Sequence, residues 1–203
     1  MEGARKATKA IAFGDTLKEP FKSLIGTMLS ARTRDETTAQ VCRALFKKVK
    51  NFQDILDMPA PELEKLIKPI GFYKTKVRYM KGIAEKIMSE YGGEIPDTID
   101  DLVRLPGVGR KTANLVVAVA FGKPSVCVDT HVHRICNRTG IVKTKTPGQT
   151  EKVLRKTAPI YLWSEINRRF VPFGKRICTP ISPHCSICPL DNKCPKIGVT
   201  QSR

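Results

Sequence analysis

The stretch Leu105–Ala113, Leu-Pro-Gly-Val-Gly-Arg-Lys-Thr-Ala, places two glycines and two cations at the start of an expected helix. Glycines spaced by one residue permit backbone conformations closed to other residues. The amides that follow point outward from a helix N-terminus, where they can bind a phosphate without reading a base. The pattern predicts a helix-hairpin-helix that binds a nucleic-acid backbone through Gly107, Val108, Gly109 and Arg110. The alternative is an ordinary turn between two helices.

Lys111 lies in the first turn after this hairpin. A helix N-terminus and neighbouring cations disfavour a protonated amine, and an unprotonated lysine amine is a nucleophile. A lysine beside a basic loop is more commonly a further phosphate contact. Both interpretations of Lys111 stay open from this residue alone.

Asp129 follows residues 125–128 and precedes a basic segment that we expect to be helical. In a cationic chain, a carboxylate beside a DNA site would repel phosphate, so its presence suggests a chemical task. The alternative is that Asp129 only caps the helix, and both can hold. His131 and His133 have no further metal ligand nearby, so we expect phosphate contacts or packing from them.

Four of the seven cysteines cluster near the C-terminus with the spacing Cys-x6-Cys-x2-Cys-x5-Cys: Cys178, Cys185, Cys188 and Cys194. Four thiolates in one short segment can enclose a tetrahedral ion or a cubane cluster. Structural zinc usually takes two close pairs separated by a longer spacer, and only one close pair occurs here. The spacing favours an iron–sulfur cluster and leaves zinc as the alternative.

The composition points to a polyanionic partner. The chain has 203 residues, with 36 Lys and Arg against 19 Asp and Glu and a formal net charge of +17. Neutralising phosphates supplies most non-specific nucleic-acid affinity, and the alternative is a merely soluble basic surface. We see no basic amphipathic membrane-binding stretch, apolar span or secretory signal, so we expect a cytoplasmic or nucleoid protein. In that reducing setting Cys42, Cys127 and Cys136 are predicted to be buried free thiols.

Periodicity and capping signals predict an all-α fold. We expect helices at 21–31, 33–49, 61–67, 76–91, 98–105, 114–121 and 128–138 and one that begins at the capping box of residues 146–149. Residues 33–36 form a second capping-box pattern, and Thr98 is expected to cap the helix that it begins. The apolar run 114–121 would suit a buried strand or a buried helix, and its polar lead-in favours a helix. Residues 66–74 resemble residues 102–110, which suggests two helical hairpins of similar build.

The hairpin with its lysine, the aspartate about one core helix later and the terminal cysteine run together resemble endonuclease III. The resemblance covers about residues 21–195. It implies a two-domain all-α fold, with a six-helix barrel at 21–128 and a second helical domain formed by 1–20 and 129–203. It also implies a [4Fe-4S] cluster held by the four clustered cysteines, which shapes a DNA-binding loop and performs no redox catalysis.

The same resemblance implies a base-excision DNA glycosylase and abasic-site lyase. Double-stranded DNA with a damaged base or an abasic site would lie across the cleft between the domains, with Lys111 facing Asp129. An oxidised pyrimidine is flipped out, Lys111 attacks the sugar C1′, and Asp129 stabilises the cationic sugar or accepts the amine proton. A Schiff base forms, and β-elimination breaks the strand on the 3′ side. We expect the protein to act as a monomer.

The chain departs from the family pattern at two places. Members often carry Gln after Leu-Ser-Ala, where this chain has Arg32, which would fill the gap left by the flipped nucleotide and alter the opposite-base preference. The second wedge would be Phe72, an aromatic able to stack between bases, whose alternative is a core position. The loop 179–184 has no Lys or Arg where relatives are often basic, so its DNA contact is in doubt.

Two other functions remain open from the sequence. The same fold acting on mismatched uracil or thymine is one, because the base pocket cannot be derived from these motifs. A non-catalytic iron–sulfur DNA-binding module is the other. Lys111 and Asp129 disfavour the module, since binding a backbone requires neither.

Overall fold

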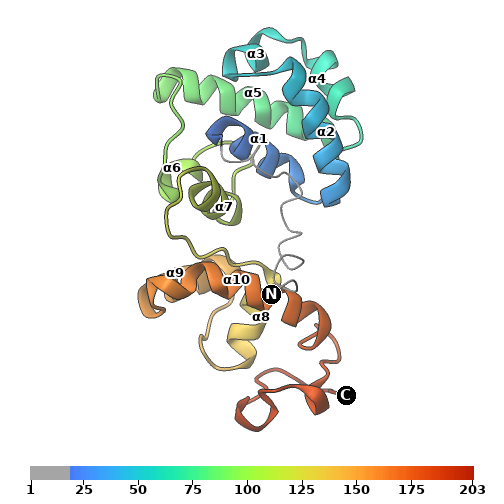
Figure 1. Cartoon of the computed structure of the whole chain (residues 1–203), viewed down its shortest axis with the longest axis vertical. Coiled ribbons are helices and arrows are strands. Elements are labelled where there is room, and N and C mark those ends of the chain that lie inside the picture. The colour runs from blue at the N-terminus through green and yellow to red at the C-terminus, as the bar shows by residue number, and fades with distance from the viewer. Residues whose placement is uncertain (1–18) are drawn as a thin grey trace, which may run out of the picture. The chain divides into compact units, whose positions relative to one another are not determined.

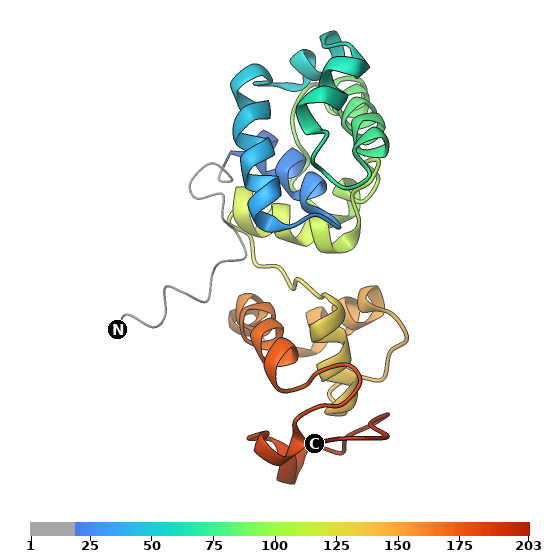
Figure 2. The ribbon, with the colours of Figure 1, turned by 90° about the vertical axis from the view of Figure 1, so that its right-hand side faces the viewer.

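The computed structural model describes residues 19–203, which are helical and contain no strand, so the predicted all-α class is confirmed. Two compact units make up this part of the chain (Figures 1 and 2). The first ends at Lys123 and the second begins at Pro124. The expectation for residues 1–18 lies outside the described residues.

The first unit contains seven α-helices among its described residues. They are α1 (Pro20–Ser30), α2 (Asp35–Lys48), α3 (Phe52–Asp57), α4 (Ala60–Ile67), α5 (Tyr73–Glu90), α6 (Ile99–Leu102) and α7 (Arg110–Ala120). Helix α1 is nearly covered by its neighbours and packs most extensively on α7 and then on α2 (Figure 1). Of these helices, α3 was not expected from the sequence. The apolar run 114–121 is helical, as its polar lead-in indicated.

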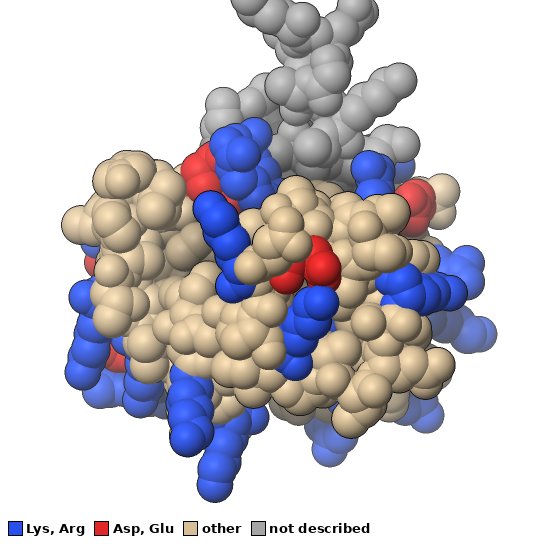
Figure 3. All heavy atoms as spheres, turned by 90° about the horizontal axis from the view of Figure 1, so that it is seen from below, with Lys and Arg blue, Asp and Glu red and all other residues tan. Residues whose placement is uncertain are grey.

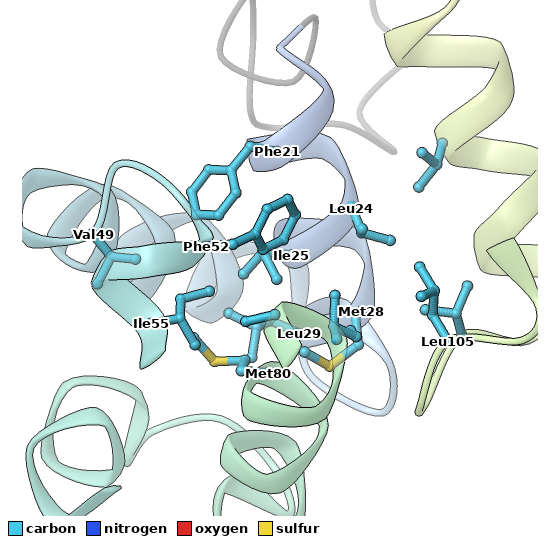
Figure 4. Packing of buried hydrophobic residues seen from close by; sticks show 14 of the residues in the cluster. Phe21, Leu24, Ile25, Met28, Leu29, Val49, Phe52, Ile55, Met80 and Leu105 are labelled. Carbon is cyan, nitrogen blue, oxygen red and sulfur yellow. The ribbon is translucent and has the colours of Figure 1, made fainter. Parts of the chain in front are cut away.

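The core of this unit forms around α1. Leu24, Ile25 and Leu29 have no exposed surface, and the ring centroids of Phe21 and Phe52 lie 5.0 Å apart at an edge-to-face angle (Figure 4). Full burial of one such side chain stabilises the fold by roughly 1.5–3 kcal/mol. This packing makes α1 a rigid base for the loop that follows it.

Two expected capping signals form and one does not. Thr146 and Gln149 make the reciprocal capping box at the start of α9 (Pro147–Thr157), and the Thr98 hydroxyl accepts from Asp101 N at 3.2 Å. At α2 the N-cap is Arg34, and the expected capping box at Thr33 is absent. The Thr33 hydroxyl instead accepts the Gly71 N–H at 3.2 Å, so a contact distant in sequence replaces the local one.

The second unit consists of α8 (Thr130–Arg138), α9, η2 (Ile160–Leu162), α10 (Trp163–Arg176), η3 (Cys185–Ile187) and η4 (Asp191–Lys193). Helix α8 packs on α10 and on α9. Val126 and Val128 are buried in this unit's core with Val132 and Leu154. These two valines place the boundary after Lys123, five residues before the expected position at 128. Among the described helices, none has the length and apolar character that crossing a bilayer requires.

Candidate functional site

The expected hairpin lies between α6 and α7. Val108 N–H donates to the Leu105 carbonyl at 3.1 Å, and the Val108 side chain is buried. The hydrogen-bond ladder of α7 begins with Ala113 N–H donating to Gly109 O at 2.9 Å, so the first-turn amides lie outside it. Val108, one of the four residues predicted to bind a nucleic-acid backbone, therefore supports the turn from inside. The N-terminus of α7 comes directly after Gly109.

The two hairpin glycines have different physical roles. Gly107 has a φ of +72°, and a Cβ there would lie 2.3 Å from Cδ2 of Tyr79 on α5. This position therefore excludes a side chain both by conformation and by space. A Cβ on Gly109 would meet nothing within 4 Å, so its side faces open space. An approaching anion can come close to the backbone at Gly109.

Lys111 is exposed in the first turn of α7. Its neighbour Arg110 makes an ion pair with the exposed Asp100 at 3.2 Å. An exposed pair of this kind is worth about 0–1 kcal/mol, so a phosphate can replace the carboxylate at little cost. The hairpin, the lysine and the arginine thus form one cationic surface at the start of α7.

Arg32 and Phe72, the two expected wedge residues, are brought together by the fold. Arg32 follows α1, and Phe72 immediately precedes α5 as its N-cap. The Phe72 ring is 64% exposed, so the alternative of a core phenylalanine is wrong. The Arg32 guanidinium lies 5.7 Å from the centre of that ring, within cation–π range.

Lys76 is a functional candidate that the sequence reasoning missed. Its side chain is only 5% exposed, and its Nζ donates to the carbonyls of Leu29 and Ala31, both at 2.6 Å. Burial lowers the pKa of Lys76 to about 8. The signal that could have found it is its position beside Val77, on the face of α5 that is otherwise apolar.

Asp129 is the N-cap of α8, as the structural alternative predicted. Its Oδ1 accepts the backbone N–H groups of His131 and Val132, each at 2.9 Å. Both donors bind one oxygen, so Oδ2 stays outside the cap. The cap therefore fixes the carboxylate in orientation without engaging both of its oxygens. Asp129 and Lys111 belong to different units.

The histidines after Asp129 have partners within the second unit. His131 Nδ1 lies 3.2 Å from Arg134 Nη2, and Gly174 of α10 packs against the imidazole. His133 Nδ1 lies 2.7 Å from the Thr150 hydroxyl. His133 is thus a packing residue, and His131 orients Arg134, whose guanidinium also donates to the Cys178 carbonyl at 2.8 Å.

The four clustered cysteines line one cavity in the second unit, together with apolar side chains such as Ile135, Phe173 and Leu190. All four are half-buried and free of disulfides. Arg138 Nη1 donates to Cys178 Sγ at 3.4 Å, the type of contact that stabilises a thiolate. Within residues 19–203, no three Cys, His, Asp or Glu side chains are grouped as ligands of a single metal ion.

The other cysteines behave as structural thiols. Burial raises the pKa of Cys42 to about 12 and that of Cys136 to about 11, which keeps both protonated. Cys127 is only partly buried, so the expectation of a buried thiol is wrong at that position.

The surface charge agrees with a polyanionic partner. On the face shown in Figure 3, Lys and Arg side chains are spread widely, and Asp and Glu are few. With a net charge of +17 the chain attracts phosphate over distances near the Debye length of about 8 Å at physiological salt.

Residues 25–159 match the family described as HhH-GPD superfamily base excision DNA repair protein. Endonuclease III of Thermotoga maritima is 45% identical over 193 residues, which cover 95% of this chain and 91% of that protein. The solved structure of a trapped endonuclease III–DNA covalent intermediate is 40% identical, has a TM-score of 0.78 and covers 88% of this chain and 84% of its own. The structure of a thermostable thymine-DNA glycosylase is 28% identical and has a TM-score of 0.79. The match covers 93% of this chain and 89% of that one.

Proposed function

The chain belongs to the endonuclease III family of HhH-GPD base excision DNA repair proteins and is a DNA glycosylase with abasic-site lyase activity, and we propose that it removes oxidised pyrimidines from duplex DNA. The protein acts as a monomer on DNA that contains a damaged base or an abasic site. The observation that carries this proposal is Lys111, which is exposed in the first turn of α7, directly after the hairpin between α6 and α7.

Lys111 is the nucleophile in the proposed reaction. The lone pair of its Nζ forms a bond to the sugar C1′ as the bond from C1′ to the base breaks, and the departing base takes the electron pair and a proton. The sugar ring opens to give a Schiff base between Lys111 and C1′. Loss of a proton from C2′ then expels the 3′ phosphate by β-elimination, which breaks the strand.

Asp129 supplies the negative charge that this reaction needs. Its carboxylate stabilises the cationic sugar at the transition state and accepts a proton from the attacking amine. The cap through Oδ1 supports this role, because two backbone N–H groups hold the carboxylate in one orientation. In this proposal the cap and the chemical role of Asp129 are compatible, because the cap uses only Oδ1.

The hairpin amides, Arg110 and the two wedge residues bind DNA without taking part in bond breaking. The hairpin amides after Gly109 and the Arg110 guanidinium bind backbone phosphate. Arg32 fills the space left by the flipped nucleotide and donates to the orphan base, and Phe72 stacks between bases. His131 contributes by orienting Arg134. The loop 179–184, which lacks Lys and Arg, has no assigned contact.

Cys178, Cys185, Cys188 and Cys194 would hold a [4Fe-4S] cluster. Four disulfide-free thiols around one cavity, with an arginine donating to one of them, fit this group. When bound, the cluster supplies structural cross-linking of the C-terminal loops and no step of the reaction. The residues around it then hold those loops in place: Arg138 also donates to the Thr179 carbonyl at 2.6 Å.

Borohydride trapping tests the proposal. The protein is incubated with a duplex that contains an abasic site, and borohydride reduces any Schiff base to a stable adduct. We expect an adduct from the wild type and from Lys123→Ala, and none from Lys111→Ala. Lys123 pairs with Asp97 just after α7, so its removal loses one positive charge without removing the nucleophile. Tight DNA binding by the wild type without an adduct would instead identify a non-catalytic module.

Thymine in mismatches is a second candidate substrate, favoured by the likeness to the thymine-DNA glycosylase structure. A panel of duplexes with thymine glycol, uracil opposite guanine and thymine opposite guanine separates the two. Faster release of thymine glycol supports the oxidised-pyrimidine proposal, and faster release of mismatched thymine replaces it.

A further inference from the structure

Two segments that carry the expected wedge residues are joined by a buried lysine. We call residues 31–33 the Arg32 loop and residues 68–72 the Phe72 hairpin. Lys76 Nζ donates to the Ala31 carbonyl at 2.6 Å, to the Leu29 carbonyl at 2.6 Å and to Thr33 Oγ1 at 3.2 Å. An ammonium has three donors, so all three are used at the end of α1.

The Thr33 hydroxyl extends this connection to the Phe72 hairpin. It accepts the Gly71 N–H at 3.2 Å as well as the Lys76 ammonium. A Cβ on Gly71 would lie 2.9 Å from the Arg32 carbonyl oxygen, so the two backbones are in close contact. The Arg32 loop and the Phe72 hairpin therefore form one packed assembly.

The two side chains at the tips share an unusual backbone conformation. Arg32 has a φ of +55° and Phe72 a φ of +58°, and within residues 19–203 only Lys196 is another non-glycine residue with positive φ. A side-chain-bearing residue in this conformation is strained, and it persists only when its surroundings hold it. The hydrogen bonds of Lys76 and Thr33 lie directly beside both positions, at Ala31 and at Gly71.

We propose that Lys76 is a positioning residue that locks the Arg32 loop to the Phe72 hairpin, so that Arg32 and Phe72 enter damaged DNA as one preassembled wedge. The inference rests on the proposed function, in which these two side chains insert at the lesion. A preassembled pair binds more tightly because less conformational freedom is lost on insertion. Lys76 acts through the two segments, since its amine lies beneath them and is removed from water.

The same helix offers a matched control. Lys81, also on α5, donates to the carbonyls of Leu56 and Met58 at 2.7 Å each, at the end of α3. Lys76→Met and Lys81→Met each remove one ammonium that binds two helix-end carbonyls. Only the first removes hydrogen bonds to the Arg32 loop. Thr33→Val is a second variant, which cuts the link to Gly71 without removing a buried charge.

The experiment uses the holoprotein and a duplex with a tetrahydrofuran abasic-site analogue opposite 2-aminopurine. Insertion of a wedge unstacks the 2-aminopurine and raises its fluorescence. We expect the wild type and Lys81→Met to show this rise and to prefer the abasic duplex over an undamaged one. Lys76→Met and Thr33→Val should lose most of the rise and at least tenfold of the preference.

Two results would overturn the inference: an unchanged rise and preference in Lys76→Met, or an equal loss in Lys81→Met. Borohydride trapping of the same proteins keeps this failure apart from failure of the proposed function. A wild type that traps an abasic site while Lys76→Met retains its wedge signal refutes only the role of Lys76. A wild type with neither an adduct nor a fluorescence rise refutes both.

Discussion

Gly107→Ala tests whether the hairpin between α6 and α7 depends on the absence of one side chain. At its φ of +72° an alanine costs about 1–2 kcal/mol. The new Cβ would also lie 2.3 Å from Cδ2 and 2.7 Å from Cγ of Tyr79. Because Cγ is where the ring joins the side chain, rotating the ring cannot relieve the overlap, and overpacking of this kind costs about 1–3 kcal/mol. We expect a total loss of about 2–5 kcal/mol in the free energy of unfolding.

Gly92→Ala is the matched control for this measurement. Gly92 has a φ of +59°, and a Cβ there would meet nothing within 4 Å. This variant should carry only the conformational cost of about 1–2 kcal/mol. Urea unfolding of the two holoproteins gives both values, and their difference isolates the packing with Tyr79.

The double variant Gly107→Ala/Tyr79→Ala completes the test. Removing the ring should restore the packing share of the loss, which gives a coupling energy of about 1–3 kcal/mol in a double-mutant cycle. Affinity for undamaged duplex DNA should fall for Gly107→Ala and stay unchanged for Gly92→Ala. Equal losses of unfolding free energy in the two single variants would refute the reasoning, because they would show that the contact with Tyr79 adds no packing cost.

The other predictions concern charge, strain and the cysteine cavity. Asp129→Asn should slow base removal roughly 100-fold or more while DNA affinity holds or rises, since asparagine also caps helices and only the charge is lost; weaker binding with normal single-turnover rates would contradict this. The pKa of Lys76 is about 8 in the folded protein against 10.5 ordinarily, so the unfolded chain binds more protons between those pH values. The unfolding free energy of the wild type should therefore rise by up to about 3 kcal/mol relative to Lys76→Met across that window, and parallel pH curves would disprove it. The free energy of unfolding, measured in urea, should be about 1 kcal/mol higher for Phe72→Gly than for Phe72→Ala, because glycine adopts the positive φ without strain. Cys188→Ser should give poorly soluble protein without the broad visible absorption of an iron–sulfur cluster, whereas a soluble, coloured variant would exclude Cys188 as a ligand.

Local signals in the sequence predicted local structure well. The capping box at Thr146 and the cap at Thr98 depend on residues three positions away, and both form. Thr33 has the same kind of signal and fails, because its hydroxyl has partners 38 and 43 residues away. The place of Lys76 beneath two loops depends on the same tertiary contacts. The spacing of residues within α5 cannot predict these hydrogen bonds, because the partners of Lys76 lie 43 to 47 residues away in the sequence.

The two similar hairpins expose different groups at their turns. In both, a helix ends, a glycine lies in the turn and a second helix begins, as the likeness of 66–74 to 102–110 suggested. In the hairpin before α7, positive φ falls on Gly107, and the next residue, Val108, is buried. In the hairpin before α5, positive φ falls one residue later, on Phe72, and that side chain is exposed. Because the positive φ lies one residue later in the hairpin before α5, that hairpin exposes an aromatic side chain, whereas the hairpin before α7 exposes backbone amides. A hairpin of the first kind suits phosphate and one of the second kind suits stacked bases, so the pair can serve two different needs of the same repair reaction.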